Sequence, residues 1–577
     1  MLSDFVRCLL LFPLVTFGLG WPLAARLSAE PAEKLCASVV LSLLATYLAA
    51  FGVYVFALPL AAFLCLPMAA AVGLILERNS LSHLFADPDV RSLLVGQFLV
   101  TAWCVGLLLL VVFYSGGGWV GDWYEHWERT QFFTGRWPLE SKFLGAYLLP
   151  ARPPLANLVT GALIAPIGVT FPNYQVVTTL LNCLAFLPAA LLARRFHFRT
   201  VGAGNAAPVI AVLTVLVMVN PSFVENATFA WTKLIAACFI LSGLYFFLRA
   251  HDPQPPDSRN ARESSLLCGA CLAAGMIAHY SAGPFVVVLV IAWLALNFRR
   301  WKEPAYWRLT ALTGVVAAFI LATWFAWSLE KFGLAATVAS NSSAAVEPEW
   351  RDHQWLKIAL NLRDTVVPHF LRTLDPELIT QTSRWGYLRD WWFQLYQVNL
   401  LFVFGSVAWV ALLADLLRRR REAAARDRRF WIFFVLGVVL LGIAVHGARD
   451  HWGLAHICLQ ALVVLGISYL AARWSSLGRG WRRLIIGGAV VDVVLGIALE
   501  FGVESNVVVR WTPPDAVVAE RIATFAATAK MNFLAKLLNR LSFVSDAATI
   551  PPGMTVVFVI VVLWLALARI RAVRPRA

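Results

Sequence analysis

The densest group of reactive side chains in the sequence is the run Gly-Asp-Trp-Tyr-Glu-His-Trp-Glu-Arg, residues 121–129. If this run forms a helix, one face carries Asp122, Glu125, His126 and Arg129, at spacings i, i+3, i+4 and i+7. A carboxylate base, a proton carrier and a cation on one face suit a transfer reaction on an anionic substrate. The same residue types also suit a solvated helix with tryptophans anchored at a membrane surface.

A second group follows in the run Ala-Arg-Pro-Pro-Leu-Ala-Asn, residues 151–157. Two prolines directly before an apolar segment fix the angle at which the chain enters a helix. Arg152 therefore stands near a helix start, which favours anions, and a phosphate could meet it there. Asn157 lies within the first turn of the same expected helix. A simple structural cap is the alternative interpretation of this motif.

Further candidates lie at the ends of apolar segments. Lys233 is ionisable within such a segment, where a charge is costly and often functional, although its side chain could also extend to the surface. His279 and Tyr280 end another segment. They are candidate substrate contacts, and the alternative is an aromatic residue at the membrane interface beside a histidine that has a structural hydrogen-bond partner. Arg449 and His451 flank an aspartate where a late segment begins, which makes them further candidates for substrate binding.

The composition excludes a soluble globular protein. The 577 residues are 60% hydrophobic and 14% charged, with a mean hydropathy of +0.71, whereas soluble domains have roughly 25% charged residues. The net charge of +15 comes largely from short basic runs between apolar segments, which is typical of cytoplasmic loops rather than of nucleic-acid binding. The nine cysteines are scattered, and we expect neither a metal nor a cofactor.

The apolar segments predict an all-α polytopic membrane protein with about 13–15 transmembrane helices. They lie near residues 5–26, 35–56, 57–76, 92–114, 174–194, 207–225, 227–249, 264–280, 282–298, 308–328, 397–417, 430–448, 453–473, 484–501 and 552–570. Residues 155–169 are too short to span, and we expect a helix half-buried at the membrane surface there.

The basic loops give the orientation. We place in the cytoplasm the loops with Arg194, Arg195 and Arg199; Arg249, Arg259 and Arg262; Arg299, Arg300 and Lys302; Arg418 to Arg421; Arg473, Arg482 and Arg483; and Arg571, Arg574 and Arg576. The alternate loops are then exoplasmic, and they include residues 115–173, the Trp-rich residues 329–395, and residues 502–551 with an amphipathic helix. The Ala, Arg and Pro content indicates a bacterial inner membrane, with the reactive cluster facing the periplasm.

The motifs resemble those of a known superfamily. An Asp-led acidic and histidine cluster directly after a span, a Gly-x-x-Pro turn at 135–138 and Arg-Pro-Pro-Leu at 152–155 are similar to the first exoplasmic loop of membrane glycosyltransferases. The resemblance is to the GT-C type, to the protein O-mannosyltransferases and lipid A aminoarabinose transferases. On this basis we expect accessory helices in 1–90, a catalytic core in 91–328 and a C-terminal membrane region in 396–577.

The resemblance implies transfer of a sugar from a polyprenyl-phosphate-linked donor to an exoplasmic glycan, lipid or protein. Asp122 would be the general base, and Arg152, with Arg129, would hold the donor phosphate as it leaves, in one inverting displacement without a metal. The implied substrate-binding residues are Glu125, His126, Arg129, Arg152, Asn157, Lys233, His279, Tyr280, Arg449 and His451.

The alternative is a transporter or flippase for a lipid-linked or small solute. Transporters bury polar residues near the bilayer midplane and show paired repeats with broken helices. Here the polar residues gather at the expected exoplasmic surface, and the sequence has no evident repeat, which favours the enzyme. A ligase or polymerase of lipid-linked glycans stays open beside a single-sugar transferase.

Overall fold

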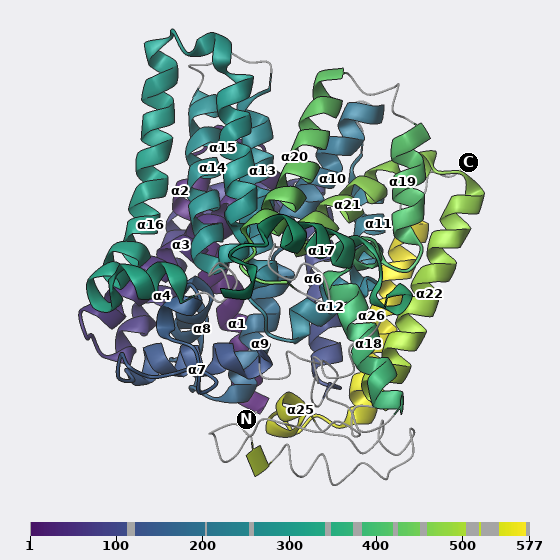
Figure 1. Ribbon diagram of the computed structural model, residues 1–577. Coiled ribbons are helices and arrows are strands. Elements are labelled where there is room, and N and C mark those ends of the chain that lie inside the picture. Colours follow the sequence, from purple (N-terminus) through teal and green to yellow (C-terminus); the bar gives the residue numbers. More distant parts are fainter. Residues whose placement is uncertain are drawn as a thin grey trace.

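The computed structural model describes residues 2–111, 122–201, 205–252, 259–340, 348–372, 384–418, 425–449, 459–502, 519–520 and 542–572. These residues form helices and connecting loops, without a β-strand among them. Figure 1 shows most of the long helices running side by side in one bundle. The expected all-α fold is therefore confirmed for the described part of the chain.

The first helices form an N-terminal group that packs against the following ones. It comprises α1 (Leu2–Gly18), α2 (Trp21–Ala24), α3 (Pro31–Val55), η1 (Leu60–Leu64), α4 (Cys65–Leu76) and α5 (Arg78–Ala86). Helix α3 contacts α8, and α1 contacts both α8 and α9. These helices therefore cover one side of the centre of the molecule, and an accessory role for residues 1–90 stays a prediction.

The central helices position the candidate site. They are α6 (Pro88–Leu108), α7 (Asp122–Gly135), η3 (Leu149–Ala151), α8 (Leu155–Ile164), α9 (Phe171–Cys183), α10 (Phe186–Val201), α11 (Ala207–Met218), α12 (Pro221–Thr228), α13 (Lys233–Ala250), α14 (Arg259–Ala278), η4 (Tyr280–Ala282), α15 (Gly283–Leu296) and α16 (Pro304–Ala339). Helix α8 is short, as expected, but all ten of its residues are buried, because α3, α7 and α9 surround it.

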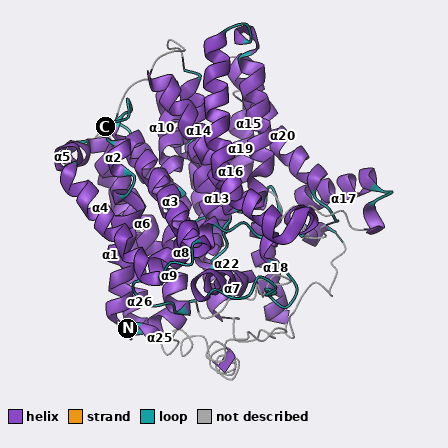
Figure 2. Cartoon of the chain, turned by 90° about the vertical axis from the view of Figure 1, so that its left-hand side faces the viewer, coloured by secondary structure: helices purple, strands orange, loops and turns teal. Residues whose placement is uncertain are grey.

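The remaining helices complete the bundle. They are α17 (Gln354–Val366), α18 (Arg384–Val398), η9 (Phe402–Phe404), α19 (Ala408–Arg418), α20 (Ala425–Val445), α21 (Leu459–Arg473), α22 (Arg479–Gly502), α25 (Phe543–Ala547) and α26 (Pro552–Ala572). Helix α17 projects from the side of the bundle in Figure 2. Its Lys357 and Asp364 are buried while Trp355 is 84% exposed, which is the pattern of a helix lying at a membrane surface.

Eight helical stretches of the described chain are long and apolar enough to cross a membrane. They are Leu2–Ala24, Pro31–Val55, Pro88–Leu108, Phe171–Phe198, Lys233–Ala250, Pro304–Val338, Asp427–Val445 and Pro552–Ala572. Two bent pairs raise the number to ten if each pair is one span: Leu60–Leu76 with Arg78–Ala86, and Ala207–Met218 with Pro221–Thr228. The protein is therefore a polytopic membrane protein.

The expected span at 397–417 is divided in the structure. Residues 397–417 are not one helix, because a 3-10 turn and Gly405, with φ at 107°, separate α18 from α19. Helix α19 has 11 residues, well short of the about 20 that a membrane crossing requires. The apolar run was long enough for a span, but its composition gives no sign of the left-handed turn within it.

The bend at Asn220 brings polar groups into the centre of the bundle. The residue before a proline favours an extended backbone, and Asn220 (φ −82°, ψ 116°) ends α11 in this way. Its side chain then accepts a hydrogen bond from the Phe223 backbone N–H at 2.8 Å and caps α12. Helix α12 runs at 68° to α11 and leads into the turn that precedes α13.

The candidate site and the basic α15–α16 turn lie at opposite ends of the bundle. In Figure 1, α7 and α8 are at the lower end, and the turn between α15 and α16 is at the top. That turn carries Arg299, Arg300 and Lys302. This separation is compatible with the expected orientation, in which the basic turn and the reactive cluster face opposite sides of the membrane.

Candidate active site

Helix α7 carries the four residues that the sequence places on one face. The side chains of Glu125, His126 and Arg129 are buried, and Asp122 at the start of the helix is partly buried. Glu125 and Arg129 form an ion pair across one helical turn, with 2.7 Å between Glu125 Oε1 and an Arg129 terminal nitrogen. The helical spacing therefore does bring acid and base groups together, away from bulk water.

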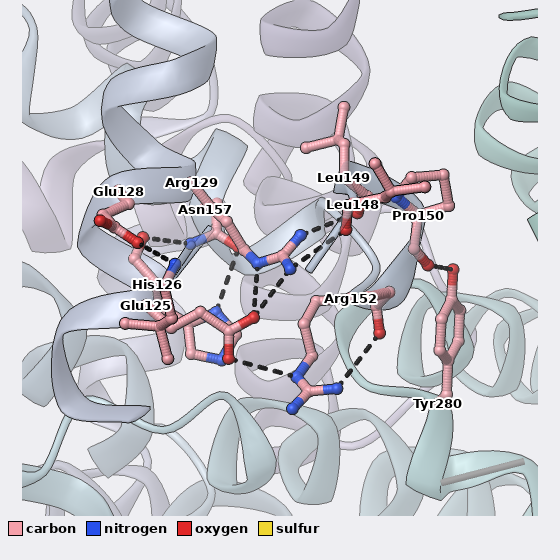
Figure 3. A network of polar contacts seen from close by, with 12 residues as sticks. Glu125, His126, Glu128, Arg129, Leu148, Leu149, Pro150, Arg152, Asn157 and Tyr280 are labelled. Carbon is pink, nitrogen blue, oxygen red and sulfur yellow. Dashed lines mark hydrogen bonds and ion pairs between the residues drawn. The ribbon is translucent and has the colours of Figure 1, made fainter. Parts of the chain in front are cut away.

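A second arginine reaches the same carboxylate. The Arg152 Nε lies 3.6 Å from Glu125 Oε2, and Figure 3 shows Glu125 between the two guanidinium groups. Burial favours the neutral acid, but the positive charges of Arg152 and Arg129 outweigh it and lower the pKa of Glu125 to about 2. Glu125 is thus an anion that holds both arginines in place.

The two arginines differ in their surroundings. Arg129 is 1% exposed, and it donates to the carbonyl oxygens of Leu149 (2.8 Å) and Leu148 (3.3 Å). Its guanidinium carbon also lies 4.3 Å from the centre of the Phe143 ring. The side chain of Arg152 keeps 18% of its surface exposed. Arg129 therefore ties α7 to the η3 segment, while Arg152 is the guanidinium that a ligand can reach.

His126 and Asn157 link α7 to α8. The Asn157 amide donates to the His126 carbonyl oxygen at 2.7 Å and to Thr130 Oγ1 at 3.2 Å. The His126 Nδ1 lies 3.4 Å from Asn157 Oδ1. Burial lowers the pKa of His126 to about 4, so its imidazole is neutral at pH 7. These contacts fix the two helices against each other.

Asp122 lies beside positive charges and one indole. Its Oδ2 accepts a hydrogen bond from Trp231 Nε1 at 3.3 Å. Burial and the negative charge of Glu125 raise the pKa of Asp122 to about 6, while Arg152, Lys233 and the indole act in the opposite direction. At pH 7 the carboxylate is therefore mostly ionised, and its pKa is close enough to neutrality for general base catalysis.

Lys233 begins α13 on the other side of this indole. Its Nζ lies 4.5 Å from the centre of the Trp231 ring, a cation–π contact, and the residue is 9% exposed. The positive charge of Lys233 also acts on Asp122. The lysine thus lies in the same group of charges as Asp122, and its contact with a substrate stays a prediction.

His279 and Tyr280 lie at the junction of α14 and α15. Tyr280 donates through its hydroxyl to the Pro150 carbonyl oxygen at 3.1 Å and accepts from Trp324 Nε1 at 2.9 Å. His279 Nδ1 accepts from the Ser281 backbone N–H at 3.1 Å and caps η4. Tyr280 therefore braces the segment that leads to Arg152 (Figure 3), and substrate contact by either residue stays a prediction.

Arg449 belongs to another cluster. The buried carboxylate of Asp364 on α17 lies 3.5 Å from Arg449 Nε, 2.7 Å from Arg363 and 2.8 Å from Arg372. The pair with Arg449 joins α17 to the residues after α20. The structure describes Arg449 but not His451, which lies outside the described residues. A role for His451 stays a prediction.

Three neighbours of the site were not singled out from the sequence. Trp231 contacts Asp122, and the Tyr147 ring centre lies 5.6 Å from the Arg152 guanidinium carbon. Glu128 accepts from the Leu144 backbone N–H at 2.8 Å and so holds the loop after α7. The one available signal was a tryptophan two residues before the buried Lys233.

Within the described residues, no three His, Cys, Asp or Glu side chains gather as a metal site.

Comparison with known proteins finds a family match and several similar solved structures. Residues 98–332 match the family PMT, described as dolichyl-phosphate-mannose-protein mannosyltransferase. No curated protein matches the chain. Crystal structures of ArnT from Cupriavidus metallidurans, bound to undecaprenyl phosphate and in the apo state, are each 17% identical. Each alignment covers 82% of this chain and 76% of the ArnT chain, and the TM-scores are 0.45 for the bound structure and 0.43 for the apo structure.

Proposed function

Because residues 98–332 match the family described as dolichyl-phosphate-mannose-protein mannosyltransferase, we propose that this chain is a membrane glycosyltransferase with Asp122 as its general base. The donor is a sugar linked to a polyprenyl phosphate. The acceptor is a hydroxyl or amine of a glycan, lipid or protein on the exoplasmic side. In a bacterial cell this side is the periplasmic face of the inner membrane.

The reaction is one displacement at the anomeric carbon. The acceptor atom forms a bond to this carbon while the bond from the carbon to the phosphate oxygen breaks. The acceptor proton passes to the Asp122 carboxylate, and the polyprenyl phosphate leaves with the bonding electrons. A single in-line displacement inverts the configuration of the sugar.

The observation that carries the proposal is an ionised carboxylate beside a reachable guanidinium. Asp122 has a pKa of about 6, and Arg152 acts on it electrostatically from the start of the Pro-Pro-Leu motif. Glu125 binds Arg152 through Oε2 and so fixes its position. A base and an anion-binding group held before the substrates arrive lower the barrier, because neither must reorganise during the reaction.

Arg152 is the residue that we assign to the donor phosphate. Negative charge develops on the phosphate oxygen as it leaves, and a charge-assisted hydrogen bond to a guanidinium strengthens with that charge. Arg129 is almost fully buried and donates to two backbone carbonyls. We therefore assign Arg129 a structural role, in which it holds the segment before Arg152 in place. Lys233 adds a second positive charge near the same place.

Sugar transfer in membranes tests the function. Labelled polyprenyl-phosphate sugars of several kinds are offered to membranes with and without the protein, with native envelope glycans and lipids as acceptors. The proposal expects a labelled product whose anomeric configuration is opposite to that of the donor. Retention of configuration would contradict the single displacement. Movement of an uncleaved donor across the bilayer, without product, would favour the transporter instead.

A further inference from the structure

Trp231 reaches the proposed base from a distant part of the chain. Its indole N–H donates to Asp122 Oδ2 at 3.3 Å, although the two residues are 109 positions apart. We propose that Trp231 is a positioning residue, whose indole holds Oδ2 so that Oδ1 is presented to the acceptor proton. This inference rests on the proposed function of Asp122 and concerns how its carboxylate is oriented.

The backbone on either side of the indole is fixed by one buried amide. Asn182, from α9, donates through Nδ2 to the carbonyl oxygens of Trp231 (2.9 Å) and Asn226 (3.1 Å). Its Oδ1 accepts from the Ile235 backbone N–H at 3.2 Å. A single side chain thus ties the end of α12, the connecting turn and the start of α13. The turn is held in one conformation because a buried amide without these partners would be costly.

The turn contains a backbone conformation that few residues with a side chain adopt. Ala230 has φ at +65°, in the left-handed region, directly before Trp231. Such a conformation persists only where its surroundings enforce it, and it often marks a functional position. Here it directs the indole of Trp231 toward α7. The Trp231 ring centre lies 4.4 Å from that of Phe229 and 5.9 Å from that of Phe393, so the indole plane is fixed as well.

A cation lies against the indole. The Lys233 Nζ is 4.5 Å from the ring centre of Trp231. A positive charge over the ring face draws electron density from it, which makes the indole N–H a better donor to a carboxylate. Lys233, Trp231 and Asp122 therefore form a chain in which the lysine acts on the base both directly and through the indole.

The charge balance at Asp122 gives the proposal a measurable consequence. Glu125 on the same helix raises the pKa of Asp122, while Arg152 before α8, Lys233 on α13 and the Trp231 hydrogen bond lower it. Tyr147 also interacts with this carboxyl. Because the indole stabilises the charged form, its loss should raise the pKa of Asp122 above its value of about 6.

The test compares two tryptophan-to-phenylalanine changes in the full-length protein in lipid nanodiscs. W231F removes the donor to Asp122. W127F is the matched control, because Trp127 is a buried tryptophan of α7 whose Nε1 has no hydrogen bond to the residues that the structure describes. Both changes remove the same atoms from a buried aromatic cluster. The kinetic probe is the polyprenyl-phosphate sugar that the wild-type protein consumes.

For W231F we expect kcat to fall about tenfold or more at pH 7 because the base is misoriented, with little change in the KM for the donor. The acid limb of the pH–rate profile should move upward by about one pH unit. W127F should retain the wild-type midpoint. Equal losses in both variants with an unchanged midpoint would overturn the proposal and leave Trp231 a packing residue.

A measurement without turnover separates this proposal from the proposed function. Infrared difference spectra between wild type and D122N isolate the Asp122 carboxyl, whose titration midpoint should be near pH 6 and higher in W231F. This holds even if no sugar is transferred, in which case the proposed function alone fails. If W231F does not fold, the indole N–H signals of ¹⁵N-labelled wild-type protein and of D122N can be followed by NMR as the pH changes. One indole N–H signal should titrate near pH 6 and cease to do so in D122N; its absence would overturn the proposal.

Discussion

Glu125 determines the charge state and position of its neighbours. It binds Arg129 through Oε1 and Arg152 through Oε2, and its negative charge raises the pKa of Asp122. One buried carboxylate thus orients the proposed phosphate ligand and tunes the proposed base. The arrangement requires that Glu125 remain ionised, which two adjacent guanidinium groups ensure.

The depressed pKa of Glu125 predicts how stability changes in acid. Its value in the folded protein is about 2, below the ordinary 4.5, so ionised Glu125 stabilises the protein above pH 4.5. This contribution, about 3 kcal/mol, is lost as the pH falls from 4.5 toward 2. The free energy of unfolding in detergent, measured from pH 5 to pH 3, should therefore fall less steeply in E125Q than in wild type. Equal slopes would contradict this ion pairing.

The residues of the site were only partly predictable from the sequence. Helical spacing correctly grouped Asp122, Glu125 and Arg129, because neighbours along one helix are fixed by its periodicity. Trp231 could not be found in this way, since its contact with Asp122 depends on how α7 packs against the turn before α13. The contact of Arg449 with Asp364 likewise depends on where α17 lies.

At the scale of elements, the contact between α7 and α8 positions the two halves of the site. Asn157 on α8 makes this contact, because its amide donates to the His126 carbonyl and to Thr130 Oγ1 on α7. The sequence suggested Asn157 as a substrate ligand. Its position in the structure, with 2% exposure, indicates a structural contact beside any such role.

Replacing Asn157 distinguishes these roles. N157A removes the amide that donates to the buried His126 carbonyl and to Thr130 Oγ1, and we expect a loss of about 1–3 kcal/mol in the free energy of unfolding. A purely structural contact should leave the KM for the donor close to the wild-type value. Thermal unfolding and donor titration measure the two quantities. A large rise in KM without loss of stability would instead identify Asn157 as a ligand.

The helices themselves were largely predictable, for a physical reason. Backbone polar groups within lipid must be paired inside the segment, so long apolar runs become helices. The segments near 35–56, 92–114 and 552–570 correspond closely to α3, α6 and α26. The division of 397–417 arises at Gly405, where a left-handed turn interrupts an apolar run.

At the scale of the whole molecule, an ion network joins the N-terminal helices to the central ones. Glu33 on α3 pairs with Arg249 and accepts a hydrogen bond from the Tyr245 hydroxyl at 2.5 Å. Glu30 pairs with Arg194 at 2.6 Å. Arg194 on α10 and Arg249 on α13 belong to the basic groups that the positive-inside rule assigns to the cytoplasm. The network therefore stabilises the bundle at the end that we assign to that side.

The proposed orientation can be tested with two single cysteines. Glu140 follows α7 and Lys302 lies in the α15–α16 turn, and both are exposed. In a C65S/C458S background, because Cys65 is exposed and Cys458 lies outside the described residues, a membrane-impermeant maleimide should label E140C in intact cells. K302C should react only after the inner membrane is opened. The reverse pattern would put the candidate site on the cytoplasmic side.

The central claim is that Asp122 accepts the proton of the sugar acceptor. The direct measurement is the transfer rate of D122N against wild type at equal protein level, at saturating donor and across pH. The near-isosteric change removes the base while keeping its size, and D415N, a buried carboxyl on α19, is the control. We predict a loss of about 10²–10⁴-fold in kcat for D122N and none for D415N. A D122N rate equal to that of wild type, with the same pH profile, would contradict it.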